Sequence, residues 1–131
     1  MDREELKRQT FLGVAQLISG LGTCQRAKVG AVLVMDGMVV ATGYNGSPTG
    51  KPHCIDEGCI MSKGHCVRTI HAEINCMINA AKAGIATNAG TIYTTHTPCN
   101  NCTLYLYQAG IKKVFYDGDY GNSELFREYY S

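Results

Sequence analysis

Two short strings of metal-binding side chains constrain this chain more than any other feature. The first is His71 with Glu73 two residues later, and the second is Cys99 with Cys102 three residues later. Residues three apart on a helix share one face, so both thiols can reach one metal ion. His71 stands at the predicted start of another helix. A single ion would therefore hold two helix N-termini together, and the fold must allow them to meet.

The number of ligands indicates what such a metal would do. A structural zinc is closed by four protein ligands, whereas a catalytic zinc has three and leaves one position for water. His71, Cys99 and Cys102 supply three ligands, which leaves Glu73 to act as a proton shuttle. Zinc lowers the pKa of bound water from about 15.7 toward 7, so the predicted nucleophile is zinc-bound hydroxide. The alternative, a chance occurrence of these residue types on helices, is disfavoured by their order and spacing.

Length and composition are those of one globular domain spanning residues 1–131. The chain is 45% hydrophobic and 18% charged, and it has no apolar run long enough to cross a bilayer. Its 12 Lys and Arg residues nearly balance its 11 Asp and Glu residues. This balance favours a small-molecule substrate and disfavours both a polynucleotide and a membrane as partners.

The N-terminus and the cysteine content indicate a reducing compartment. Residues 1–8 are densely charged and lack the apolar segment of a secretory signal, which predicts a cytoplasmic location, or the host cytoplasm if the chain is viral. There are seven cysteines, and an odd number argues against a closed disulfide framework. Metal binding is the leading account of them.

Hydrophobic periodicity predicts alternating helices and strands. Asp36 and Gly37 join two β-branched runs and predict a hairpin. Pro98 is expected at the first position of the helix that carries Cys99 and Cys102. The predicted helices cover residues 2–19, 71–83, 99–109 and 123–130, and the predicted strands cover residues 29–35, 38–44, 91–95 and 114–116.

The pattern His-x-Glu followed by Pro-Cys-x-x-Cys is the signature of the zinc nucleobase deaminases. Three further segments, residues 24–31, 43–48 and 64–73, resemble the deoxycytidylate (dCMP) deaminase branch of the zinc-dependent cytidine/deoxycytidylate deaminase superfamily. The resemblance covers roughly residues 5–120. It implies an α/β fold of three layers, α/β/α, with a mixed central sheet. It also implies hydrolytic deamination of dCMP to dUMP, which supplies thymidylate synthesis.

The resemblance carries expectations about assembly and regulation. Members of the branch are homo-oligomers, commonly hexamers, activated by dCTP and inhibited by dTTP, with Mg²⁺ accompanying the allosteric nucleotide. They usually continue past the last helix into another strand, whereas this chain ends at Ser131.

Five residues are candidates for substrate contact. The resemblance assigns the sugar of the nucleotide to Asn45, which would otherwise be read as a left-handed turn residue. Arg26 and Lys28 could meet the phosphate, although single basic residues are usually solvated. Ala72 and Tyr120 complete the set. For His96, three residues before Cys99, a loop-stabilising or solvent role is favoured over catalysis.

Residues 45–69 lack periodicity and are long for an unstructured loop, so something other than a core must order them. Cys24 and Cys54 resemble ligands of a second, structural zinc in phage members of the branch. Our hypothesis completes that site with two of three further residues: Cys59, His65 and Cys66. Reduced thiols buried without metal are the alternative.

Two other functions remain open at this point. One is deamination of another cytosine or guanine nucleoside or base. The other is a zinc-ordered binding module that performs no chemistry. Glu73 beside a three-ligand site discriminates against the second, because a binding module does not need a spare carboxylate.

Overall fold

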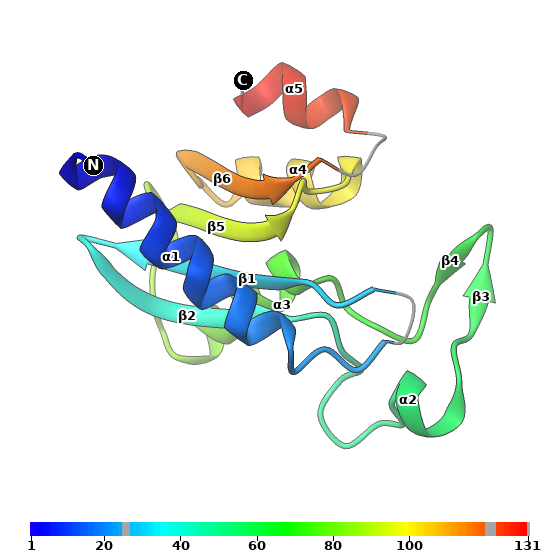
Figure 1. Cartoon of the computed structure of the whole chain (residues 1–131). Helices are drawn as coiled ribbons and strands as arrows, with labels where there is room; N and C mark the ends of the chain where they lie inside the picture. The colour runs from blue at the N-terminus through cyan, green and yellow to red at the C-terminus, as the bar shows by residue number, and fades with distance from the viewer. Residues whose placement is uncertain (25–26, 120–122, 131) are drawn as a thin grey trace.

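A computed structural model describes residues 1–24, 27–119 and 123–130 of the chain, except for the side chain of His65. Its centre is a four-stranded sheet of order β2-β1-β5-β6 (Figure 1). The strands are β1 (Gly30–Met35), β2 (Met38–Tyr44), β5 (Thr91–His96) and β6 (Lys113–Gly118). β1 pairs antiparallel with both β2 and β5, while β5 and β6 are parallel. The sheet is therefore mixed, as predicted.

Helices cover both faces of this sheet. Helix α1 (Arg3–Ser19) lies across one face, and α3 (Ala72–Lys82) and α4 (Asn100–Gln108) belong to the other (Figure 1). Helix α5 (Glu124–Tyr130) packs against α4. This arrangement confirms the predicted three-layer α/β/α fold. Among the described residues, no helix combines the length and apolar character needed to span a membrane.

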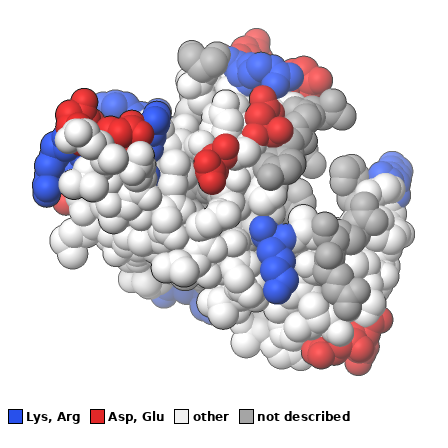
Figure 2. Space-filling model, in the orientation of Figure 1, with Lys and Arg blue, Asp and Glu red and all other residues white. Residues whose placement is uncertain are grey.

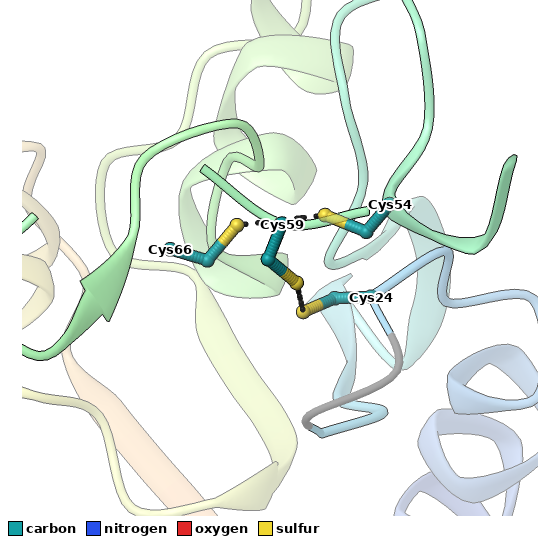
Figure 3. Close-up of side chains that lie close together, drawn as sticks. All are labelled: Cys24, Cys54, Cys59 and Cys66. Carbon is teal, nitrogen blue, oxygen red and sulfur yellow. Dashed lines mark hydrogen bonds between the residues drawn. The ribbon is translucent and has the colours of Figure 1, made fainter. Parts of the chain in front are cut away.

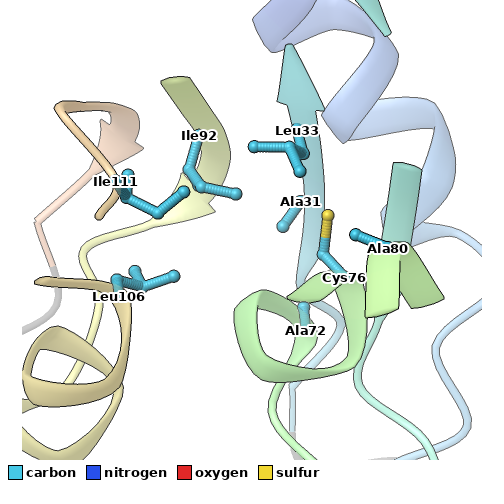
Figure 4. Packing of buried hydrophobic residues seen from close by; sticks show 8 residues of the cluster. All are labelled: Ala31, Leu33, Ala72, Cys76, Ala80, Ile92, Leu106 and Ile111. Atoms are coloured by element: carbon cyan, nitrogen blue, oxygen red, sulfur yellow. The ribbon is translucent and has the colours of Figure 1, made fainter. Parts of the chain in front are cut away.

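The two cores follow from strand alternation, because successive side chains of a strand point to opposite faces. Ala31 and Leu33 of β1 join the cluster on the α3 and α4 side, whereas Val32 and Val34 join the cluster under α1. Figure 4 shows the first cluster, which places α3 and α4 against the sheet. Its fully or almost fully buried members are Ala31, Leu33, Ala72, Cys76, Ala80, Ile92, Leu106 and Ile111.

Two glycines allow the helices to approach the sheet closely. A Cβ atom at Gly30 would collide with the backbone of α1 at Ala15 and Ser19. A Cβ atom at Gly43 would collide with the backbone of α3 at Ala72 and Cys76. Gly43 therefore sets the position of the first turn of α3, directly after His71.

The segment 45–69 contains short elements that the sequence does not predict. They are α2 (Cys54–Glu57), β3 (Met61–Ser62) and β4 (His65–Cys66), and the two strands form a hairpin. Figure 1 shows this region set apart from the four-stranded sheet. Ile55, Ile60 and Met61 are about half exposed, so these large apolar side chains do not form a buried core for the segment.

The start of α4 differs from the prediction. Pro98 was expected at the first helical position, but the helix begins at Asn100 and Cys99 is its N-cap. The physical reason is that the Cys99 thiol accepts the backbone N–H of Cys102, at 3.4 Å, and so caps the helix itself. Pro98 is fully buried, and its carbonyl accepts a hydrogen bond from the Ser123 hydroxyl.

Candidate active site

The two helix N-termini meet, as their spacing predicts. His71 is the N-cap of α3, Cys99 is the N-cap of α4, and Cys102 lies in the first turn of α4. The Nδ1 atom of His71 is 3.2 Å from the Cys102 Sγ and 3.5 Å from the Cys99 Sγ. Hydrogen bonds from Cys102 and His71 lower the pKa of the Cys99 thiol to about 4, whereas the neighbouring Cys99 sulfur and burial raise the pKa of Cys102.

The separation of these atoms is suited to a metal ion. The three ligand atoms all lie within 4.8 Å of one another. Tetrahedral zinc with ordinary Zn–N and Zn–S bonds separates neighbouring ligand atoms by roughly 3.3 to 3.8 Å. His71, Cys99 and Cys102 could therefore hold zinc with little rearrangement, and three ligands leave one position for another molecule.

The Glu73 carboxyl lies beside this cluster without belonging to it. The side chain is only 4% exposed, on the first turn of α3. Burial raises its pKa to about 7, although its own backbone amide, the His71 charge and the Cys102 thiol all favour the carboxylate. A carboxyl that titrates near neutral pH can both accept and return a proton.

A cavity of about 520 Å³ opens onto Glu73 and two of the three cluster residues. Its volume is in the range of small-ligand pockets. The lining residues are Cys24, Ala27, Val29, Asn45, Gly64, Cys66, Thr69, His71, Ala72, Glu73, His96, Thr97 and Cys99.

Asn45 lines this cavity and also holds one of its walls. Its Oδ1 accepts the N–H of Val29 at 2.8 Å, and its Nδ2 donates to the carbonyl of Ala27 at 2.6 Å. The side chain is 7% exposed. Asn45 is not a left-handed turn residue. Among the described residues other than glycine, only Asp36, Lys63 and Ala89 have positive φ.

The other predicted contact residues divide into three groups. Ala72 lines the cavity at the start of α3. Lys28 is exposed and is not one of the described lining residues. Arg26 and Tyr120 lie outside the described residues.

His96 lies at the cavity, a position that the sequence motifs do not indicate. It is the last residue of β5, and it lines the cavity together with Glu73 and His71. Alternation along β5 was the available signal, because Ile92 points to the α3 and α4 side and His96 follows it by an even number of residues. Thr69 and Thr97 line the cavity as well and were not predicted.

A second cluster contains four cysteines from the hairpin region and from the segment before β1 (Figure 3). The Sγ atoms of Cys24 and Cys59 are 3.8 Å apart, and those of Cys54 and Cys66 are 3.4 Å apart. All four are free thiols whose Sγ atoms lie within 4.8 Å of one another. Their separations suit a tetrahedral ion, while the side chain of His65 lies outside the described part of the chain.

Hydrogen bonds around Cys66 favour a thiolate. Burial acts to raise the pKa of its thiol, but backbone N–H groups of Arg68 and Ile60 and the neighbouring thiols lower it to about 6. Burial raises the pKa of Cys54 to about 12, with added contributions from Cys59 and Cys66. A cluster in which one thiol ionises easily and shares its charge with three others is a typical metal-binding environment.

Comparison with known proteins agrees with this geometry. The chain is 47% identical over 112 residues to ComE operon protein 2 of Bacillus subtilis, a match that covers 86% of this chain and 59% of that protein. It is 32% identical over 157 residues to the deoxycytidylate deaminase of Enterobacteria phage T4, covering 91% of this chain and 81% of that one.

A solved structure gives the same result. The dCMP deaminase from the cyanophage S-TIM5, in complex with dCMP and dUMP, has a TM-score of 0.78 and 34% sequence identity. The match covers 92% of this chain and 85% of that chain. It confirms the fold that the resemblance predicts.

The sequence pattern of the cytidine and deoxycytidylate deaminase zinc-binding region matches residues 6–117. This region contains the three cluster residues, Glu73 and most of the chain. The predicted family is thereby confirmed: the chain belongs to the cytidine and deoxycytidylate deaminases that this zinc-binding region defines.

Proposed function

We propose that this chain is a zinc-dependent hydrolase that converts dCMP and water to dUMP and ammonia. The observation that carries the proposal is the buried Glu73 carboxyl, which shares a cavity with the cluster of His71, Cys99 and Cys102 but is not one of its ligands. The names of the phage T4 relative and of the S-TIM5 structure support dCMP as the substrate.

The side chains of the site have distinct roles in this reaction. His71, Cys99 and Cys102 would hold the zinc, which when bound supplies hydroxide by lowering the pKa of water toward 7. Glu73 accepts the proton released by the attacking water and passes it to the ring nitrogen N3. The carboxylate then takes the remaining proton from the oxygen now bonded to C4 and delivers it to the amino group, so that the C4=O bond forms, the C4–N bond breaks and ammonia leaves. Ala72 and Asn45 are proposed to contact the base and the sugar.

The second cluster is proposed to be a structural zinc site with Cys24, Cys54, Cys59 and Cys66 as ligands. Four ligands close the coordination shell, which suits a site without chemistry. The exposure of Ile55, Ile60 and Met61 supports this role, since a metal would supply order that the packing of these side chains does not.

A nucleotide suits the surface better than a polynucleotide does. In the view of Figure 2, charged side chains occur in small scattered groups, some of which contain both acidic and basic residues, without a continuous basic face. The net charge of +1 gives little attraction to a phosphate backbone. Regulation by dCTP and dTTP with Mg²⁺, and association into a homo-oligomer such as a hexamer, remain proposals that rest on the resemblance.

A panel of substrates tests the proposed reaction. Ammonia release by the zinc-loaded chain is measured with dCMP, dCTP, cytidine, cytosine and guanine. We expect dCMP to give the highest kcat/KM. A higher value for cytosine, cytidine or guanine would contradict the assignment of substrate, and release from none of them would contradict the assignment of activity.

A further inference from the structure

His96 occupies a part of the cavity that no role assigned so far accounts for. It ends β5 and lines the same cavity as His71, Glu73 and Cys99. Only Thr97 and Pro98 separate it from the Cys99 N-cap, and three residues of chain span at most about 10 Å. The imidazole is therefore close to the place where a bound base would react.

The loop between β5 and α4 is held by other residues. Thr97 donates its backbone N–H to the carbonyl of Gly118 at 2.9 Å, and its hydroxyl lies 3.0 Å from the same carbonyl. Pro98 is fully buried and its carbonyl accepts the Ser123 hydroxyl. These contacts stabilise the loop through Thr97 and Pro98.

A buried hydroxyl contacts the Nδ1 atom of the His96 ring. The Thr95 Oγ1 accepts the N–H of Gly30 at 3.2 Å and lies 2.7 Å from the Nδ1 of His96. Thr95 is 5% exposed, and its hydroxyl has one proton to donate. If the hydroxyl donates this proton to Nδ1, a neutral His96 imidazole carries its own proton on Nε2. Burial lowers the pKa of His96, which also favours the neutral ring.

We propose that His96 is a substrate-contacting residue, whose Nε2–H donates a hydrogen bond to an oxygen of the nucleotide bound in this cavity, with Thr95 as the positioning residue that orients the ring. This inference rests on the proposed function, because it needs a nucleotide in the cavity. The role differs from that of Glu73: His96 contributes to binding and moves no proton.

Two substitutions separate the ring nitrogens. His96→Asn keeps a polar atom near the position of Nδ1, and therefore the contact with Thr95, but removes the donor at Nε2. His96→Gln places an amide N–H near the position of Nε2. We expect His96→Asn to lower kcat/KM for dCMP about tenfold, mainly through KM, as expected for one lost hydrogen bond. We expect His96→Gln to recover at least half of that loss. Zinc content and Tm should match the parent protein.

The His96 ring can also be observed directly. Long-range ¹H–¹⁵N spectra of the zinc-loaded parent protein should show the Nε2–H tautomer, and addition of dUMP should shift the Nε2 signal. Comparing deoxycytidine with dCMP as substrates identifies the acceptor. If His96 contacts the phosphate, His96→Asn lowers kcat/KM for dCMP alone. If it contacts the base or the sugar, kcat/KM falls for both substrates.

Two results would overturn the inference while leaving the proposed function intact. In the first, the parent enzyme deaminates dCMP, the KM of His96→Asn equals that of the parent, and dUMP does not shift the Nε2 signal. The other is an equal loss in His96→Asn and His96→Gln together with a lowered Tm, which indicates a structural role. If the parent protein neither deaminates dCMP nor binds dUMP, the proposed function itself fails.

Discussion

A carboxyl group as enclosed as that of Glu73 loses most of the hydration that stabilises its charge. Its pKa of about 7, against a reference value of 4.5, means that the folded chain holds a proton that the unfolded chain releases. The site therefore lowers the stability of the folded protein at neutral pH. The proposed proton shuttle would make use of this carboxyl, because a group with a pKa near 7 can take up and return a proton at neutral pH.

Glu73→Gln tests this cost in protein depleted of metal. Because the folded pKa is raised, the favourable contribution of Glu73 is complete below its unfolded pKa and is lost as the pH rises through about 7. We expect the free energy of unfolding of Glu73→Gln to exceed that of the parent by about 3 kcal/mol at pH 8 and to match it near pH 4.5, because each pKa unit corresponds to about 1.4 kcal/mol. Denaturant titrations at both pH values measure the difference. If the free energies of unfolding of the two proteins differ by the same amount at both pH values, the pKa of Glu73 is not raised by folding and its carboxyl is exposed to solvent.

Sequence reasoning succeeded at the residue scale where spacing along a helix decides contact. His71, Cys99 and Cys102 converge because each lies in a helix start that local signals mark. It failed where contact depends on tertiary packing. The Asn45 side chain holds Ala27 and Val29, and His96 enters the cavity, only because β1, β2 and β5 lie side by side.

At the scale of elements, the position of α3 depends on β2. The absence of a side chain at Gly43 lets the backbone of α3 approach at Ala72 and Cys76, and this helix start carries His71 and Glu73. The hairpin between β1 and β2 was predictable because both turn residues, Asp36 and Gly37, have positive φ. The short elements between β2 and α3 were not predictable, because they have no periodic apolar pattern and instead surround a cluster of four thiols.

Gly43→Ala should displace the start of α3. Overpacking against backbone costs about 1 to 3 kcal/mol, so we expect a loss of this size in the free energy of unfolding, together with reduced dCMP turnover. Gly13→Ala is the matched control, since Gly13 lies inside α1 with no atom near an added Cβ. We expect it to be neutral or to stabilise by up to about 1 kcal/mol. Equal effects of the two substitutions in thermal unfolding would refute the role of Gly43.

Cys59→Ser tests the second metal centre. We expect the parent chain to bind two zinc ions and the variant one, as measured by elemental analysis. Cys24 and Cys66 line the cavity, so loss of this centre should also raise the KM for dCMP, although Cys59 itself is not a described lining residue. Cys76→Ala, a buried cysteine outside both clusters, should keep two ions. One zinc per parent chain would contradict the second site.

For the whole molecule, the order β2-β1-β5-β6 brings together segments that lie far apart in the sequence, and no local pattern determines that order. Helix α4 presents apolar side chains on the surface of the molecule. Leu104, Tyr105 and Tyr107 of α4 are 41%, 58% and 56% exposed, and the rings of Tyr107 and Tyr129 lie 4.9 Å apart. Groups of exposed apolar side chains of this kind often lie at interfaces.

The proposed homo-oligomer is tested by light scattering during size-exclusion chromatography. We expect a mass that is a multiple of the 14.2 kDa chain, and six times that mass for the proposed hexamer. Tyr105→Glu would place a charge on this face and should lower the mass if the face is buried between copies. A parent protein of 14.2 kDa at micromolar concentration would contradict self-association.

The most direct test of the proposed chemistry compares dCMP turnover and zinc content in the parent chain and in Glu73→Gln. If Glu73 carries protons and is not a ligand, the variant keeps the zinc content of the parent and loses about 10² to 10⁴ in kcat, the usual contribution of general acid–base catalysis. Turnover within a few-fold of the parent would contradict the proton shuttle. Loss of one zinc ion together with activity would show that Glu73 is a ligand instead.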